Sequence, residues 1–233
     1  MNDIVCTDTY FSTVKSIAGY WCAQVFFALV AMFMDTFGMK TESEYISAEQ
    51  DFMRERGIPH TLRRDNARSQ NSADVKALHR DLLIKDEFTE PHHPHQNPAE
   101  GRAIRFLKKH IEMLMNKTGS PENLWHLCAK YICHVHNMCA NPNNKWKIPN
   151  QVCRGDTQDI SHMLCFYWYQ KVLYLDPTSK FPHTKEKPGY FVGFATNSGD
   201  ALTFKILMED KRNVLVRSVV RPYREPRYMN KRV

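Results

Sequence analysis

Three carboxylates stand far apart along the 233-residue chain: Asp8, Asp65 and Glu100. Asp8 lies in an apolar run typical of a strand, Asp65 ends a second such run, and Glu100 lies in the first turn of a predicted helix. Glu100 precedes Ile104 by four residues and so shares the helix face that packs on the sheet. Taken singly, each acid fits an ordinary surface position. Held together, they would repel unless a cation neutralised them, and their hard oxygens would favour Mg²⁺ or Mn²⁺. Two such ions could support an in-line phosphoryl transfer.

The elements that must position these acids predict an α/β domain. Predicted strands cover Ile4–Thr9, two segments within 21–34, Thr61–Arg64 and Glu87–Glu90. Predicted helices cover 41–56, 72–84, a segment beginning at 97 and 121–138. Asn97 is placed to cap the third helix, and Pro98 suits its first position. Five strands with intervening helices therefore predict a mixed sheet with helices packed against it.

The rest of the chain changes character. Short β-rich runs cover 166–175, 190–196, 201–208 and 213–220, and turn signals separate them. They predict a small all-β, barrel-like module. The expected domains are 1–145 for the α/β core, 156–222 for the β-domain and 223–233 for a basic tail.

The positive charge is concentrated at the carboxyl end. The formal net charge is +7, and residues 211–233 contain eight basic residues and one acid. A solvated tail and a phosphate-binding arm both fit this pattern. A second basic stripe, separate from the face that carries Glu100, is predicted on the third helix at Arg102, Arg105 and Lys109.

Several classes of protein are disfavoured by the sequence. The longest apolar run, Val25–Met34, is about half a membrane span, and no secretory signal is recognisable, so no membrane partner is expected. The seven cysteines contain no C-x-x-C pair, which fits a reducing compartment and a soluble intracellular protein. Cys128, Cys133, His134, His136 and Cys139 point in different directions on one predicted helix, and buried core thiols are favoured over a metal site.

The contexts of the three acids resemble one family. They read Thr7-Asp8-Thr9-Tyr10-Phe11-Ser12, Leu62-Arg63-Arg64-Asp65-Asn66-Ala67 and Pro94-His95-Gln96-Asn97-Pro98-Ala99-Glu100, and Gly189-Tyr190-Phe191-Val192-Gly193-Phe194 follows downstream. In this order they resemble the catalytic core and C-terminal β-domain of copia-type LTR-retrotransposon integrases, which have a ribonuclease-H-like fold. Many family members read Gln-Asn-Gly-x-x-Glu, and the segment Gln96-Asn97-Pro98-Ala99-Glu100 of this chain is one residue shorter. The family's upstream zinc-binding domain has no counterpart in the residues before Asp8, which leads us to expect a fragment of a longer polyprotein or a decayed copy.

The resemblance implies metal-dependent cleavage of DNA ends and their joining to target DNA, by a homo-oligomer acting in the nucleus. Asp8 would bridge two Mg²⁺ or Mn²⁺ ions, with Asp65 on one and Glu100 on the other. The residues that would contact DNA are Asn66, Gln96, Asn97, Arg102, Arg105, Lys109, Arg221, Arg224 and Arg227. Two alternatives stay open: a catalytically inactive DNA-binding remnant, and a ribonuclease H with the same acidic chemistry.

Overall fold

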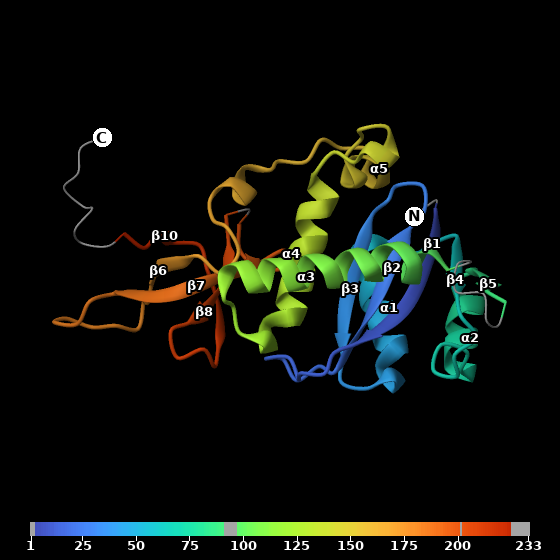
Figure 1. Ribbon diagram of the computed structural model, residues 1–233, viewed down its shortest axis with the longest axis horizontal. Helices are drawn as coiled ribbons and strands as arrows, with labels where there is room; N and C mark the ends of the chain where they lie inside the picture. The colour runs from blue at the N-terminus through green and yellow to red at the C-terminus, as the bar shows by residue number, and fades with distance from the viewer. Residues whose placement is uncertain (1–2, 91–96, 201, 225–233) are drawn as a thin grey trace. The chain divides into compact units, whose positions relative to one another are not determined.

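The computed structural model describes residues 3–90, 97–200 and 202–224, and the chain divides into two compact units, Met1–Gln158 and Asp159–Val233 (Figure 1). Each unit is built on its own five-stranded sheet. The domain boundaries expected from the sequence, 1–145, 156–222 and 223–233, stay a prediction. No helix in the described part of the chain combines the length and apolarity needed to cross a bilayer.

The sheet of the first unit is mixed. Its strands are β1 (Ile4–Phe11), β2 (Cys22–Ala28), β3 (Met34–Met39), β4 (Thr61–Arg64) and β5 (Lys85–Phe88). They lie in the order β3-β2-β1-β4-β5. The pairs β1–β2 and β2–β3 are antiparallel, whereas β4 runs parallel to both β1 and β5. The predicted five-stranded mixed sheet is thus confirmed.

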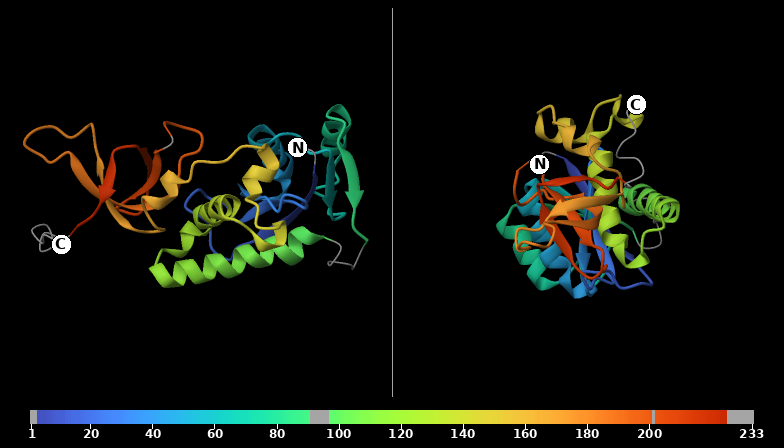
Figure 2. Two further views of the ribbon diagram at one scale, coloured as in Figure 1. Left: turned by 90° about the horizontal axis from the view of Figure 1, so that it is seen from above. Right: turned by 90° about the vertical axis from the view of Figure 1, so that its left-hand side faces the viewer.

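Helices cover both faces of this sheet (Figure 2). The α-helices are α1 (Tyr45–Arg56), α2 (Ala73–Asp81), α3 (Arg105–Thr118), α4 (Trp125–Met138) and α5 (Pro149–Arg154). Short turns of other helix types are η1 (Glu42–Glu44), η3 (Ala99–Ile104, π-helical), η4 (Glu122–Leu124), η5 (Pro142–Asn144) and, in the second unit, η6 (Ser161–Leu164). Helices α1 and α2 bury one face of the sheet, where Phe26 stacks on Phe52 at 4.3 Å between ring centroids. Tyr10 points to the other face and meets Trp125 of α4 edge-on at 5.9 Å.

The third strand begins later than predicted. The sequence placed the second and third strands together within 21–34, but β3 starts only at Met34. A tight turn fills the space between them, with Met32 at a φ of 56°. The carboxylate of Asp3 accepts hydrogen bonds from the amides of Val30 and Ala31, at 3.1 and 3.0 Å. Because the Asp3 carboxylate satisfies these two amides, the apolar run turns here without a Gly or Pro.

The second unit is an open antiparallel sheet. Its strands are β6 (Lys171–Leu175), β7 (Glu186–Phe194), β8 (Phe204–Met208), β9 (Val214–Arg217) and β10 (Val220–Pro222), in the order β10-β6-β7-β8-β9. Its core includes Phe166 and Phe204, whose ring centroids are 5.0 Å apart. A bulge interrupts β7. Gly193 lies in it with a φ of 136°, a backbone conformation that residues other than glycine rarely adopt. The expected all-β module is present, but its edge strands β9 and β10 do not pair within the described residues, so the predicted barrel is not closed.

Candidate active site

Asp8 lies near the middle of β1 and is half buried. Its Oδ1 accepts a hydrogen bond from the Thr9 amide at 2.7 Å. The pKa of Asp8 is raised to about 6, mainly by burial and in smaller part by the negative charges of Asp65 and Glu100, while the hydrogen bond from Thr9 and the charge of Lys108 act in the opposite direction. The three predicted acids, from three separate elements, therefore lie within electrostatic reach of one another.

Asp65 reaches this place through strand pairing. It follows β4 directly, and β4 pairs in parallel with β1 so that Arg63 lies opposite Cys6. Two residues further along each strand, Asp65 comes level with Asp8. The Oδ1 of Asp65 accepts a hydrogen bond from the Ala67 amide at 3.1 Å, which turns the chain away from the sheet.

Glu100 is held in place by its neighbour Asn97. The buried Asn97 donates from Nδ2 to the Thr7 carbonyl at 3.1 Å, and its Oδ1 accepts from the Ala99 amide at 3.1 Å. The second bond confirms the predicted helix cap, and the first ties the start of η3 to β1 beside Asp8. Glu100 itself is exposed, and its amide donates to the Asn97 carbonyl at 3.2 Å. The buried amide gives Asn97 a structural role that the prediction of a DNA contact did not include.

The three acids fit a hard divalent cation by donor type and by charge. Their mutual repulsion disfavours the ionised form of Asp8, and a bound cation would remove that penalty. However, no three Asp, Glu, His or Cys side chains in residues 3–90, 97–200 and 202–224 are arranged to hold a metal ion. Binding by Asp8, Asp65 and Glu100 would therefore require their side chains to turn toward one another.

A chain of polar side chains supports β1 from the face opposite Asp8. Thr9 donates from Oγ1 to Gln24 at 2.6 Å, and Gln24 donates from Nε2 to Thr7 at 2.6 Å. Gln70 reaches Thr9 from the loop after Asp65, at 3.5 Å. The guanidinium of Arg64 donates to the Gln70 carbonyl and so fixes that loop. These bonds link the segments that carry the two aspartates.

Arg64 also belongs to a buried charge network. Its guanidinium donates to Asp86 on β5 at 2.7 Å, and Asp86 contacts Nδ1 of His79 on α2 at 2.6 Å. The other ring nitrogen of His79 contacts Glu49 on α1 at 2.5 Å. Burial lowers the pKa of His79, but its hydrogen bonds to Glu49 and Asp86 outweigh burial and raise it. Because both ring nitrogens face carboxylates, the imidazole is protonated and donates to both.

Sequence reasoning missed this network, which we name the Glu49–His79–Asp86–Arg64 network. One signal could have revealed it. His79 follows the apolar Val75 by four residues and so lies on the same face of the predicted helix over 72–84. A histidine on a buried face requires polar partners, and these come from the neighbouring elements.

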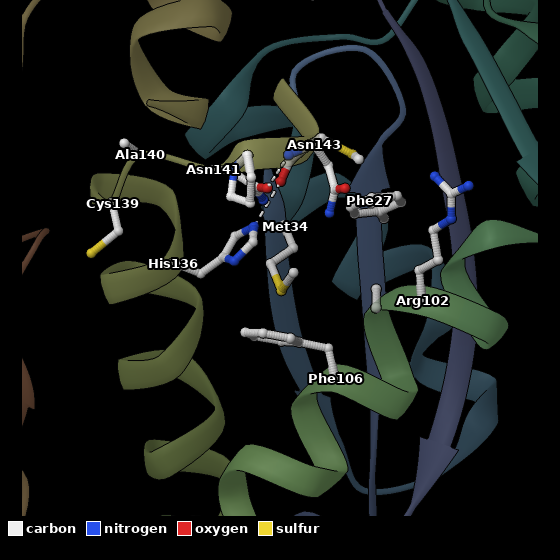
Figure 3. Close-up of a pocket in the computed structure, with 12 residues that line it drawn as sticks. Phe27, Met34, Arg102, Phe106, His136, Cys139, Ala140, Asn141 and Asn143 are labelled. Carbon is white, nitrogen blue, oxygen red and sulfur yellow. Dashed lines mark hydrogen bonds between the residues drawn. The ribbon is translucent and has the colours of Figure 1, made fainter. Parts of the chain in front are cut away.

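The predicted basic stripe is exposed to solvent. Arg102 lies on η3, and Arg105 and Lys109 follow on α3. Lys108, which the prediction omitted, is also exposed, and its charge is the one that reaches Asp8. Arg102 borders a cavity of about 760 Å³ whose other walls include Phe106, as Figure 3 shows.

The other predicted DNA contacts have varied surroundings. Asn66 is exposed, and its Oδ1 accepts a hydrogen bond from Asn71 at 2.7 Å. Arg221 is paired with Glu186, with its Nε 2.8 Å from Oε1. Arg224 is exposed. The two remaining predictions, Gln96 and Arg227, lie outside the described residues.

Two of the three helical thiols are part of the core, as expected. Cys128 and Cys133 are buried, and burial raises the pKa of both thiols well above the ordinary value. Cys139, which directly follows α4, is exposed, so the expectation of a buried thiol is wrong there. Cys128 and Cys133 therefore pack in the core beneath the helix, and Cys139 does not.

No protein-family model and no curated protein matches the sequence. Solved structures do match. One is the simian T-cell lymphotropic virus intasome in complex with the PP2A regulatory subunit B56 gamma, with a TM-score of 0.55, 15% identity, and coverage of 97% of this chain and 80% of that one. Another is the catalytic core of HTLV-2 integrase in complex with magnesium, in a trimeric form, with a TM-score of 0.54, 17% identity, and coverage of 66% and 97% respectively. The chain is thus similar in fold to retroviral integrases.

Proposed function

We propose that this chain is an integrase-type polynucleotidyl transferase, which cleaves DNA ends and joins them to target DNA. One observation carries the proposal: the parallel pairing of β1 and β4 brings Asp65 level with Asp8, and the bond from Asn97 to the Thr7 carbonyl ties the start of the helix that carries Glu100 to the same strand. The similarity in fold to an integrase core that was solved with magnesium supports the same conclusion. The motifs around the acids favour the copia type within this class.

Asp8, Asp65 and Glu100 would hold two Mg²⁺ or Mn²⁺ ions, which when bound would supply the charge stabilisation that an in-line phosphoryl transfer needs. The chain itself supplies the placement. Asn97 fixes the helix that carries Glu100, and Arg64 fixes the loop that follows Asp65.

DNA would be held mainly through its phosphates. The exposed cations of η3 and α3 lie on the same helical segment as Glu100, so a strand bound there would pass close to the acids. The proposed contacts are Asn66, Gln96, Asn97, Arg102, Arg105, Lys109, Arg221, Arg224 and Arg227. For Asn97 this contact would add to its structural bonds. A homo-oligomer acting in the nucleus belongs to the same proposal.

One observation favours a second candidate, a DNA-binding protein without catalysis. No three potential ligands in the described part of the chain converge as a metal site would require. In that case the fold and the basic surface would be retained while the acids would bind no metal.

A strand-transfer assay separates the two. Purified protein is incubated with a pre-cleaved DNA end and a plasmid target in Mg²⁺ or Mn²⁺, beside Asp65→Asn and Glu100→Gln. Glu112→Gln is the matched control, because Glu112 is an exposed acid on α3, the helix that continues from η3. Joined products from the parent and the control, and none from the two site variants, are expected. Equal DNA binding by all four proteins with no joining would establish the inactive candidate instead.

A further inference from the structure

The loop between β6 and β7 exposes one aromatic ring almost completely. Phe181 is 96% exposed, and the hairpin that carries it extends well past the paired part of its strands (Figure 1). A phenylalanine in water forgoes the favourable free energy of burial, so a partner that covered this ring would gain that free energy.

The loop is braced, so the ring is presented on an ordered turn. The His183 amide donates to the Lys180 carbonyl at 2.9 Å and closes the turn around Phe181. Below it, the Asp176 carboxylate accepts from the amide and the hydroxyl of Thr178, at 3.0 and 2.7 Å. Asp176 also pairs with Lys187 on β7. These bonds reduce the entropy that the loop would lose on binding.

The loop that carries the ring is rich in cations and hydroxyl groups. Lys180 precedes Phe181 directly, and Lys180, His183 and Thr184 border a shallow hollow beside it. Neither Lys180 nor Lys185 has an acidic partner among the residues that the structure describes. One apolar ring on a loop with Lys180 before it and Lys185 after it in the chain is complementary to a polyanion that has apolar surface between its charges. Duplex DNA, with stacked bases between two rows of phosphates, has that character.

We propose that Phe181 is a wedge that inserts between two stacked base pairs of duplex DNA, while Lys180 and Lys185 bind the phosphates on either side. The inference rests on the proposed function only in taking DNA as the substrate. Pyrimidine–purine steps unstack most easily, so the wedge would favour TA and CA steps over stiff A-tracts. Stable membrane anchoring would need more apolar groups than this loop offers, since its other residues are polar, charged or proline.

The test uses short duplexes in which 2-aminopurine replaces the purine of one central TA step, and a matched duplex in which it lies within an A-tract. The full chain and three variants are compared: Phe181→Ala, Lys180→Ala and Val219→Ala. Val219 is the control, because it is an exposed apolar residue of the same unit outside the loop. All these side chains are exposed, and circular dichroism verifies that each variant is folded.

With the parent and Val219→Ala, 2-aminopurine emission should rise in the TA duplex and much less in the A-tract duplex. Phe181→Ala should abolish the rise and bind DNA about tenfold more weakly, in line with the loss of one base–aromatic contact. Lys180→Ala should weaken binding to both duplexes and lower its salt dependence. The wedge is refuted if Phe181→Ala binds and unstacks DNA like the parent, or if Phe181→Ala changes binding to anionic phosphatidylserine vesicles but not to DNA.

The strand-transfer assay on the same preparations separates this result from that of the proposed function. A parent that unstacks the TA step through Phe181 but joins no DNA leaves the wedge intact and refutes catalysis. A parent that joins DNA while Phe181→Ala behaves identically refutes the wedge alone.

Discussion

Replacement of His79 by leucine should destabilise the first unit strongly. His79 is 1% exposed and Glu49 is 0% exposed, so the contact between them is shielded from water. Leucine keeps much of the volume of the imidazole but removes both of its N–H donors. The carboxylate of Glu49 would then lie in the core without a cation, and its Oε2 already has no hydrogen-bond partner in the described structure.

The size of the effect follows from that orphaned charge. Removal of one partner from a buried ion pair costs about 3–5 kcal/mol of the free energy of unfolding. Asp86 adds little, because its side chain is 25% exposed and keeps its bond to Arg64. A loss of about 4 kcal/mol is a large part of the ~5–15 kcal/mol that stabilises a typical domain, and it lowers the melting temperature by about 10 °C.

Urea unfolding followed by far-UV circular dichroism would measure this loss. His60→Leu is the matched control, because His60 is an exposed residue of the same unit, and its cost should stay within about 0.5 kcal/mol. The double variant Glu49→Leu/His79→Leu should be more stable than His79→Leu alone, since it removes the buried charge together with its partner.

The stabilisation by His79 should also depend on pH. The folded pKa of His79 is raised, so its contribution is fully present below the ordinary histidine value of about 6.5 and is lost as pH rises through the folded pKa. The difference in stability between the parent and His79→Leu should therefore shrink on the alkaline side. Two results would refute the buried imidazolium. One is a cost of His79→Leu below about 1 kcal/mol, and the other is a loss of stability in the double variant that equals the sum of the losses in Glu49→Leu and His79→Leu.

Three further outcomes are expected. Asp35→Asn should cost about 3 kcal/mol of the free energy of unfolding in urea, because Asp35 is buried and paired with Arg56 of α1 and Lys130 of α4. These cations lower the pKa of Asp35, so the difference in stability from the parent should persist above pH ~4 and vanish as acid protonates the folded carboxylate. Gly38→Ala should lower the melting temperature by the equivalent of about 1–3 kcal/mol, since a Cβ there would overlap the Tyr20 ring; an unchanged melting temperature would show that the ring can move away. Asn97→Ala should cost about 1–2 kcal/mol through its lost bonds to Thr7 and Ala99, and should reduce strand transfer more than DNA binding; equal losses in both assays would argue against a positioning role.

Much of the framework around the acids was predictable from local patterns. The strand that contains Asp8 and the strand that ends just before Asp65 are short β-rich runs, and the cap at Asn97 is a local side-chain to backbone bond. Such features depend on neighbours in sequence, which is why the strand carrying Asp8 and the helix cap were placed correctly.

Features that depend on distant partners were not predictable. The turn before β3 is stabilised by Asp3, so nothing within the apolar run itself marks it. Glu49 and Arg64 are charged residues that sequence patterns assign to the surface, and only the joint approach of α1, α2, β4 and β5 makes their burial favourable. Side-chain convergence around a metal likewise depends on rotamers, which residue types and spacing do not determine.

The strand order of the first unit also bears on the order in which the three acids come together during folding. Strands β1, β2 and β3 pair with their neighbours in sequence, and such local contacts form early in folding. The pairing of Ile4 with Thr61 closes a much longer loop, and the bond from Asn97 to the Thr7 carbonyl closes a longer one still. We therefore expect Asp8 to be in its strand before Asp65 and Glu100 arrive, with the repulsion among the three charges arising late in folding. A cation that relieves this repulsion would accelerate the completion of the fold rather than its initiation.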